Sequence, residues 1–262
     1  MKQKVVLICV DGMRPDGFLQ CGNPLIEKLM ERGSWTMNAR TVTPSVTLPC
    51  HMSMFHSVTP ARHGITTNLY TPPVRPINGL FEQAHLYDLS TAFFYGWEPL
   101  RDIARPLSVK SANFRCARHF EDSDTLLTTQ FLEFLQTEQP DFTFLYLVET
   151  DEKGGHDHGW MTPEYLHCVS VAVENINRVL EAVNESDTVI VTADHGGHDQ
   201  THGTELPEDM TIPMLFIGPD FGPGKELKNV SILDLAPTIA DILKIRPARE
   251  WEGHSLIKRK EN

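Results

Sequence analysis

Four short segments of the 262-residue sequence concentrate aspartate, histidine and hydroxyl side chains of the kinds that hold metal ions. Each segment directly follows a predicted strand or begins a predicted helix. The residues concerned are Asp11, Thr47, Asp151 with His156, and Asp194 with His195 and His202. Imidazole and carboxylate ligands without a thiolate favour zinc, with manganese or iron as alternatives, over calcium or magnesium. Two half-sites of this kind predict two divalent transition metals about 4 Å apart, a spacing that suits phosphoryl transfer.

Each of these segments also has an ordinary structural interpretation when it is taken alone. Asp11 after a buried strand could cap the following turn, and a hydroxyl at the start of a helix, such as Thr47, usually caps that helix. The same helix start, however, offers free backbone N–H groups and a positive dipole end to a phosphate. The segment from Asp194 to His202 places three histidines and two aspartates within nine residues. Packing alone explains that segment poorly, so we expect metal binding there.

The elements that must position these residues alternate between strands and helices along the chain. The predicted strands are Val5–Val10, Thr91–Tyr95, Phe142–Val148, Thr188–Thr192 and Met214–Ile217. The predicted helices are Pro24–Glu31, Leu48–His56, Asp122–Glu138, Pro163–Val183 and Asp234–Leu243. This alternation predicts an α/β fold with a mostly parallel central sheet and helices on both faces. The polar segments then lie at the carboxyl edge of the sheet, where such folds bind ligands.

The chain length suits one catalytic domain, residues 1–262, better than two equal domains. Residues 65–116 differ from the rest, because prolines, asparagines and glycines separate weak elements there. We therefore expect a small inserted cap beside the sheet at about residues 65–116.

Charge and cysteine content narrow the expected partners and compartment. A formal net charge of −12 argues against nucleic-acid duplexes, since binding their backbone needs clustered lysine and arginine. Five cysteines, an odd number without a C-x-x-C pair, predict reduced thiols in a cytoplasmic protein. The apolar run Val5–Val10 is too short to span a membrane and lacks a signal-peptide cleavage site. We expect a cytoplasmic protein without a membrane partner, and its oligomeric state stays open.

In their order along the chain, these motifs resemble those of the alkaline phosphatase superfamily, and most closely its type I phosphodiesterase/nucleotide pyrophosphatase branch. The resemblance covers nearly the whole chain. The motifs that carry it are Asp11-Gly12-Met13-Arg14-Pro15-Asp16, Thr47-Leu48-Pro49-Cys50-His51, Pro60-Ala61-Arg62-His63-Gly64-Ile65, Asp151 with His156 and Gly159, Asp194-His195-Gly196-Gly197 with His202-Gly203, Asp234-Leu235-Ala236-Pro237-Thr238 and Trp251-Glu252-Gly253-His254-Ser255-Leu256. Each motif is modest alone, and together they are specific.

The resemblance implies an alkaline phosphatase-like fold and a hydrolase of small anionic phosphate esters, of the phosphodiesterase or nucleotide pyrophosphatase type. It implies one metal held by Asp151, His156 and His202. It implies a second metal held by Asp11, Asp194, His195 and the Thr47 oxygen. Thr47 would attack phosphorus in line and form a phospho-threonine, which water would hydrolyse.

Cys50 departs from the pattern of this branch. It stands where diesterases of the branch usually have an asparagine that donates hydrogen bonds to a phosphoryl oxygen, and a thiol is a weak donor. We therefore expect Asn68, or the backbone N–H groups from Leu48 onward, to hold the phosphate. A sulfatase-type modified cysteine at this position is disfavoured, because the Cys-x-Pro-x-Arg pattern is absent.

The interval from Asp151 to His156 is one residue longer than in the branch. This leaves His158 and His198 as alternative ligands in place of His156 and His202.

Several rival functions use the same residues. A phosphomonoesterase, a phosphonate hydrolase or a metal-dependent phosphomutase could be built on this site. A monoester needs extra cationic groups, for which the candidates are Arg14, Arg62 and Arg101. A diester prefers an apolar wall, for which the candidates are Phe94, Tyr95 and Trp97, and we assign Trp97 to substrate binding. A metal-stabilised binding module is the non-enzyme alternative, and Thr47 argues against it because a closed structural site needs no hydroxyl.

Overall fold

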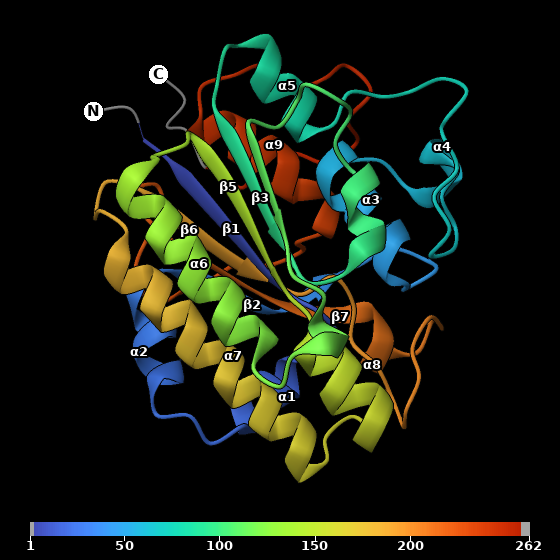
Figure 1. The fold of residues 1–262 in the computed structure, drawn as a ribbon, viewed down its shortest axis with the longest axis vertical. Coiled ribbons are helices and arrows are strands. Elements are labelled where there is room, and N and C mark those ends of the chain that lie inside the picture. Colours follow the sequence, from blue (N-terminus) through green and yellow to red (C-terminus); the bar gives the residue numbers. More distant parts are fainter. Residues whose placement is uncertain (1–2, 258–262) are drawn as a thin grey trace.

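The computed structural model describes residues 3–257 and is built around one eight-stranded sheet (Figure 1). The strands lie in the order β4-β3-β5-β1-β6-β7-β2-β8. Their bounds are β1 Val5–Val10, β2 Ser34–Arg40, β3 Thr91–Tyr95, β4 Ser111–Phe114, β5 Phe142–Leu147, β6 Thr188–Thr192, β7 Thr211–Ile217 and β8 Lys225–Glu226. Neighbouring strands from β4 to β6 are parallel, whereas β7 is antiparallel to both β6 and β2. The predicted α/β fold with a mostly parallel sheet is confirmed.

Helices cover both faces of the sheet, which explains the unbroken apolar character of its central strands (Figure 1). One face carries α1 (Pro15–Gln20), α2 (Leu25–Arg32), α6 (Ser123–Thr137) and α7 (Pro163–Ala182). The other carries α3 (Thr47–His56), α5 (Leu80–Leu86) and α9 (Leu235–Ile242). Shorter pieces are α4 (Pro60–His63), α8 (Pro207–Met210), η1 (Glu98–Asp102), η2 (Ala117–His119), η3 (Thr150–His156) and η4 (Ile232–Asp234). None of the helices within residues 3–257 combines the length and apolar character that a membrane span requires.

The segment expected as an inserted cap, residues 65–116, contributes two short strands to the sheet. It contains α5 and both β3 and β4, and β3 pairs directly with β5. The longest stretches outside these elements are residues 66–79 and 96–110. The sequence predicted β3 but not the four-residue β4, and a cap formed by the remaining residues stays a prediction.

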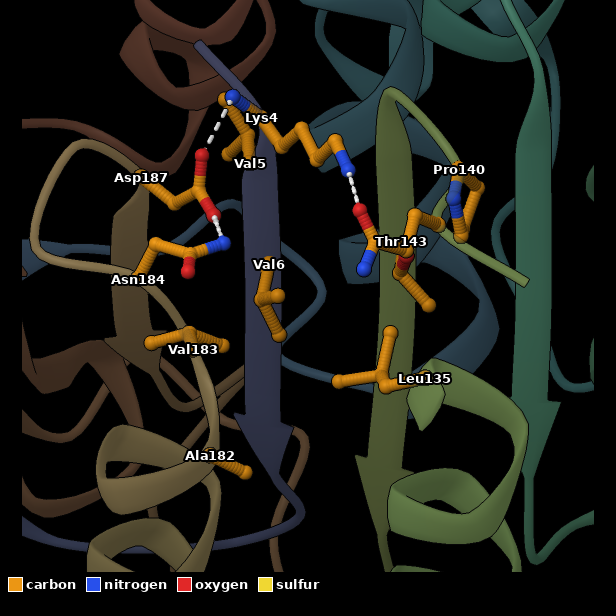
Figure 2. A pocket seen from close by; sticks show the side chains of 11 residues that line it. Lys4, Val5, Val6, Leu135, Pro140, Thr143, Ala182, Val183, Asn184 and Asp187 are labelled. Carbon is orange, nitrogen blue, oxygen red and sulfur yellow. Dashed lines mark hydrogen bonds between the residues drawn. The ribbon is translucent and has the colours of Figure 1, made fainter. Parts of the chain in front are cut away.

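A cavity of about 50 Å³ lies at the amino edge of the sheet, at the opposite ends of β1 and β5 from the polar segments (Figure 2). Its polar rim is paired internally, since the Lys4 backbone N–H and the Asn184 amide both donate to Asp187, and Lys4 Nζ donates to Gln139. Its floor is apolar, with Val6 and Leu135 facing inward (Figure 2). We assign this cavity to imperfect packing between the ends of α6 and α7.

Candidate metal centre and nucleophile

Three buried carboxylates meet at the carboxyl ends of the adjacent strands β5, β1 and β6. Asp11 directly follows β1, Asp194 comes two residues after β6, and Asp151 lies in η3 just after β5. The register pairs Val10 with Leu147, so the parallel strands end level with one another. The three side chains are at most 4% exposed. Each carboxylate thus follows a buried apolar strand, and the level strand ends bring all three to the carboxyl edge of the sheet.

Each of these carboxylates has one buried oxygen without a hydrogen-bond partner among the described residues. These oxygens are Asp11 Oδ1, Asp151 Oδ1 and Asp194 Oδ2. Burial, followed by the charges of its neighbours, raises the pKa of Asp11 well above its ordinary value, and the pKa of Asp151 rises for the same reasons. Burial also raises the pKa of Asp194. Unpaired buried carboxylates are costly, and a bound cation would compensate them.

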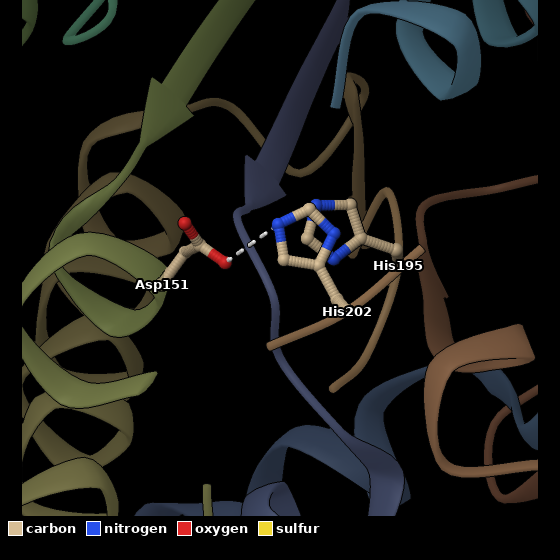
Figure 3. A group of neighbouring side chains, drawn as sticks. All are labelled: Asp151, His195 and His202. Atoms are coloured by element: carbon tan, nitrogen blue, oxygen red, sulfur yellow. Dashed lines mark ion pairs between the residues drawn. The ribbon is translucent and has the colours of Figure 1, made fainter. Parts of the chain in front are cut away.

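Three histidines direct their Nε2 atoms at these carboxylates. His195 Nε2 lies 3.3 Å from Asp11 Oδ1 and 3.6 Å from Asp194 Oδ2. His156 Nε2 is 3.3 Å from Asp151 Oδ2, and His202 Nε2 is 3.9 Å from Asp151 Oδ1. The rings of His195 and His202 stack with centroids 3.9 Å apart, and Asp151 faces this stacked pair (Figure 3).

The opposite nitrogen of each ring fixes its tautomer. Nδ1 of His195, His156 and His202 lies 2.8, 3.0 and 2.9 Å from the backbone carbonyls of residues 196, 200 and 45. A carbonyl only accepts, so Nδ1 carries the proton and Nε2 presents a lone pair. Burial lowers the pKa of His195 to about 4 and that of His202 to about 3, which keeps both rings neutral. Lone pairs aimed at carboxylate oxygens repel unless a cation lies between them, and metal-bound histidines have this arrangement.

The ligand atoms form two converging groups. Asp11, Asp194 and His195 make one, and Asp151, His195 and His202 make the other, with all atoms of a group within 4.8 Å. His195 belongs to both groups, although the family resemblance assigned it to the nucleophile side alone. His156 stands beside the second group, with its side chain 38% exposed. These residue types and their geometry fit two divalent transition metals.

The π-helical geometry of η3 accounts for the longer interval between Asp151 and His156. A π-helix closes its hydrogen bonds between residues i and i+5, so residues five apart lie one turn apart on the same face. Neither alternative ligand reaches Asp151. His158 lines an exposed groove with His167 and Cys168, and His198 Nδ1 pairs with Asp209 at 2.7 Å.

Thr47 is the first residue of α3, and Val46 takes the N-cap position that the sequence suggested for Thr47. Thr47 Oγ1 lies 3.2 Å from His195 Nε2. The Leu48 N–H donates to Asn68 Oδ1 at 3.0 Å. That N–H is therefore used within the protein, and the Asn68 amide is oriented beside Thr47 with Nδ2 as its remaining donor.

Cys50 faces the core and not the site. Its Sγ accepts from Thr41 Oγ1 at 3.2 Å, and burial raises the pKa of the thiol far above its ordinary value. The thiol thus contacts Thr41 in the core, and the expectation that Asn68 or backbone N–H groups hold the phosphate in its place stays a prediction.

The aromatic candidates for a substrate wall divide into core and edge. Phe94 packs edge-on against Phe131, and Tyr95 stacks on Phe93, so both belong to the core. Trp97 is half-buried and precedes η1 at the carboxyl edge of the sheet. Its role in substrate binding stays a prediction.

The sequence did not reveal Tyr146 and Trp160 as parts of the site. The Tyr146 hydroxyl donates to Asp11 Oδ2 from within β5. Trp160 Nε1 donates to the Gly12 carbonyl at 2.8 Å, and its ring lies 5.4 Å from that of His156. A Cβ at Gly197 would come within 2.2 Å of the Trp160 ring, so this position requires glycine. The one available signal for Tyr146 was its hydroxyl in a buried strand whose remaining residues, apart from Thr143, are apolar.

The chain is similar in sequence and fold to known proteins. Residues 5–120 match the type I phosphodiesterase / nucleotide pyrophosphatase family, and residues 92–247 match the metalloenzyme superfamily. The chain belongs to the metalloenzyme superfamily. The predicted resemblance of this metalloenzyme to alkaline phosphatase-like enzymes and to their type I phosphodiesterase branch is confirmed.

Individual relatives support the same placement of this metalloenzyme. Human ectonucleotide pyrophosphatase/phosphodiesterase family member 1 is 26% identical over an alignment of 219 residues, which covers 73% of this chain and 23% of that protein. An inactive murine ectonucleotide pyrophosphatase/phosphodiesterase 5 in complex with AMP has a TM-score of 0.78 at 15% identity, covering 94% of this chain and 96% of its own. The phosphonate monoester hydrolase of Agrobacterium radiobacter has a TM-score of 0.76 at 14% identity, covering 98% and 76%. The structural neighbours show the fold alone.

Proposed function

We propose that this metalloenzyme is a two-metal hydrolase of small anionic phosphate esters, of the phosphodiesterase/nucleotide pyrophosphatase type. One observation carries the proposal. Buried carboxylate oxygens without partners and histidine Nε2 lone pairs converge beside the hydroxyl of Thr47, at a helix start. A metal-stabilised binding module would have no use for that hydroxyl.

Two zinc ions are the proposed cofactors. Asp11, Asp194, His195 and Thr47 would hold one, on the nucleophile side. Asp151, His156 and His202 would hold the other, on the outer side. When bound, the cations neutralise charge on the phosphoryl group and lower the pKa of the Thr47 hydroxyl.

Thr47 is the proposed nucleophile. After losing its proton to solvent, Oγ1 forms a bond to phosphorus, and the ester bond to the leaving group breaks. The leaving oxygen departs with the electron pair and takes a proton from water. Water then attacks the phospho-threonine and restores the Thr47 hydroxyl. Asn68 Nδ2 donates to a non-bridging oxygen throughout.

Ion pairing of the arginines supports a diester over a monoester. Arg14 is bound to Asp16 and to a backbone carbonyl, and Arg62 is bound to Glu252. Arg101 pairs with neighbouring acids in η1. Each guanidinium proposed to neutralise a second phosphate charge is therefore already engaged. The AMP bound to the murine neighbour supports a nucleotide-like ester as the substrate class.

A matched set of esters tests the proposal. Zinc-loaded protein is assayed with an aryl phosphodiester, an aryl phosphomonoester and an aryl phosphonate monoester, and metal content is measured by mass spectrometry. We expect close to two zinc ions per chain. We expect kcat/KM to be at least about tenfold higher for the diester than for the phosphomonoester, which is about 1.4 kcal/mol of transition-state discrimination. Chelation should abolish activity. Full activity in metal-free protein would falsify the proposal. If the protein instead prefers the aryl phosphonate monoester, we would assign it as a phosphonate monoester hydrolase, like its neighbour from Agrobacterium radiobacter.

We also propose that the protein works in the cytoplasm. All five cysteines are free thiols, including the buried Cys9 and Cys50, and a reducing compartment keeps them so. Fractionation of the native host, with a cytoplasmic marker enzyme, tests this proposal.

A further inference from the structure

Two buried aromatic side chains, His51 of α3 and Tyr146 of β5, contact the nucleophile-side carboxylates from the core. Both are fully buried, and their rings meet edge-on with centroids 4.6 Å apart. The Tyr146 hydroxyl donates to Asp11 Oδ2. His51 Nδ1 lies 3.3 Å from Asp194 Oδ2. Each member of the pair therefore touches one carboxylate of the same converging group.

His51 also joins a carboxylate to the nucleophile. Its Nδ1 is 2.9 Å from the Thr47 carbonyl, one turn earlier in α3, so this nitrogen carries the proton and donates. The N–H that donates to the Thr47 backbone therefore also lies within ion-pair distance of the Asp194 side chain. The start of α3 and the end of β6 are held in a fixed relation by this single group.

Packing alone does not explain the pair. Among the described residues, His51 Nε2 has no hydrogen-bond partner, which is costly for a fully buried nitrogen. A leucine or phenylalanine would fill the space beside Phe144 without that cost. The Tyr146 hydroxyl likewise introduces a polar atom into an apolar strand. The polar atoms of the pair that do have partners, the Tyr146 hydroxyl and His51 Nδ1, contact only Asp11, Asp194 or Thr47.

We propose that His51 and Tyr146 are positioning residues that hold Asp194 and Asp11 for the metal on the nucleophile side, and that they do so selectively. The inference rests on the proposed two-metal function. Backbone carbonyls orient the histidines of both sides, but the outer carboxylate, Asp151, pairs with His156 and His202 and not with His51 or Tyr146. Loss of the pair should therefore weaken one metal position and leave the other intact.

Zinc titration of metal-free protein against a competing chelator tests this selectivity in Tyr146→Phe and His51→Leu. In each variant we expect one zinc bound as tightly as in the wild type and the other about 10–100-fold more weakly, the usual effect of removing a group that orients a metal ligand. His51→Asn keeps an N–H near the position of Nδ1 and should restore most of the lost affinity. The control is Tyr95→Phe, a buried tyrosine of β3 that stacks on Phe93, and it should bind both ions normally.

Three results would overturn the inference: wild-type affinity for both ions in Tyr146→Phe, equal weakening of both ions, and failure of His51→Asn to bind better than His51→Leu. Thermal unfolding of each metal-free variant verifies its fold. If His51→Leu does not fold, Tyr146→Phe decides alone, because it removes one oxygen atom only. A wild-type protein that binds no zinc would instead refute the proposed function, so the two failures are distinguishable.

Discussion

The two halves of the metal centre are built by different means. On the nucleophile side, Asp11 and Asp194 extend directly from the ends of β1 and β6, and His195 is fully buried beside them. On the outer side, Asp151 and His156 come from η3, and His202 comes from the loop after β6. The core side chains Tyr146 and His51 contact the first pair of carboxylates, whereas Asp151 pairs with the outer histidines themselves.

The sheet therefore fixes the nucleophile side of the metal centre, whereas two loops together form the outer side. The outer half depends on η3 and the 198–202 loop staying joined, through His156 Nδ1 to the Gln200 carbonyl and through Gln200 Nε2 to the Asp157 carbonyl at 3.1 Å. We therefore expect the nucleophile side to keep its geometry without metal and the outer side to bind its ion less tightly. The predictions below test this contrast.

The largest effect is expected at the nucleophile. Thr47→Ala should lower turnover of an aryl phosphodiester on the order of 10⁴-fold, because the covalent step is lost. The carboxylates and histidines remain, so both zinc ions should stay bound, as measured by mass spectrometry. The control is Cys50→Ala, which should retain activity within about threefold, because the thiol faces the core and makes no contact with the reacting groups. A large loss of turnover in the control would show that Cys50 takes part in the chemistry.

Removal of metal should expose the repulsion among the buried carboxylates. Their pKa values are raised in the folded protein, so the folded chain holds protons more tightly than the unfolded chain, and stability is lost as the pH rises through the raised pKa. Above about pH 7.5 the histidines are mostly neutral in both the folded and the unfolded state and contribute little to this slope. Chelated protein should therefore be less stable, in urea unfolding, at about pH 8.5 than at about pH 7.5.

The two halves should differ in this assay. Asp11→Asn should stabilise the chelated protein at the higher pH by about 2 kcal/mol, because Asp11 lies against both other carboxylates. Asp151→Asn should stabilise it less. An equal effect of the two substitutions would remove the distinction between the halves, and zinc-loaded wild type, which should lack the decline, is the control.

The smallest effect is expected at the exposed edge of the outer half. His156→Ala should weaken the outer zinc by about tenfold, with activity recovered at excess zinc. The matched variant His158→Ala, two residues further along and exposed, should bind zinc like the wild type. If the two results were exchanged, His158 would be the ligand in place of His156.

Sequence reasoning located the nucleophile side because its signals are local. A buried parallel strand is an unbroken apolar run, and Asp11 and Asp194 mark where β1 and β6 end. The same reasoning missed β2, whose buried and exposed positions alternate irregularly, and β4, which has four residues. Neither departs clearly from the pattern of a loop.

Side-chain direction and long-range contacts lay beyond the sequence. Cys50 adjoins the nucleophile in the chain but rotates into the core, while Asn68 reaches Leu48 across 20 residues of chain. His51 and Tyr146 have types and positions that suit a core equally well. Only their contacts with Asp194 and Asp11 distinguish them from packing.

The wide turn of η3 bears on how such sites tolerate insertions. One added residue in a strand would reverse the faces of all the residues after it, and in an α-helix it would rotate them by about 100°. A π-helical turn confines the extra residue to itself, and here Gly154 and Gly155 let it pack closely against Tyr165 and Trp160. This half-site therefore requires that the aspartate and the histidine lie on the same face of η3, and it does not require a fixed number of residues between them. A search that demands one spacing between aspartate and histidine would overlook chains that build the same half-site.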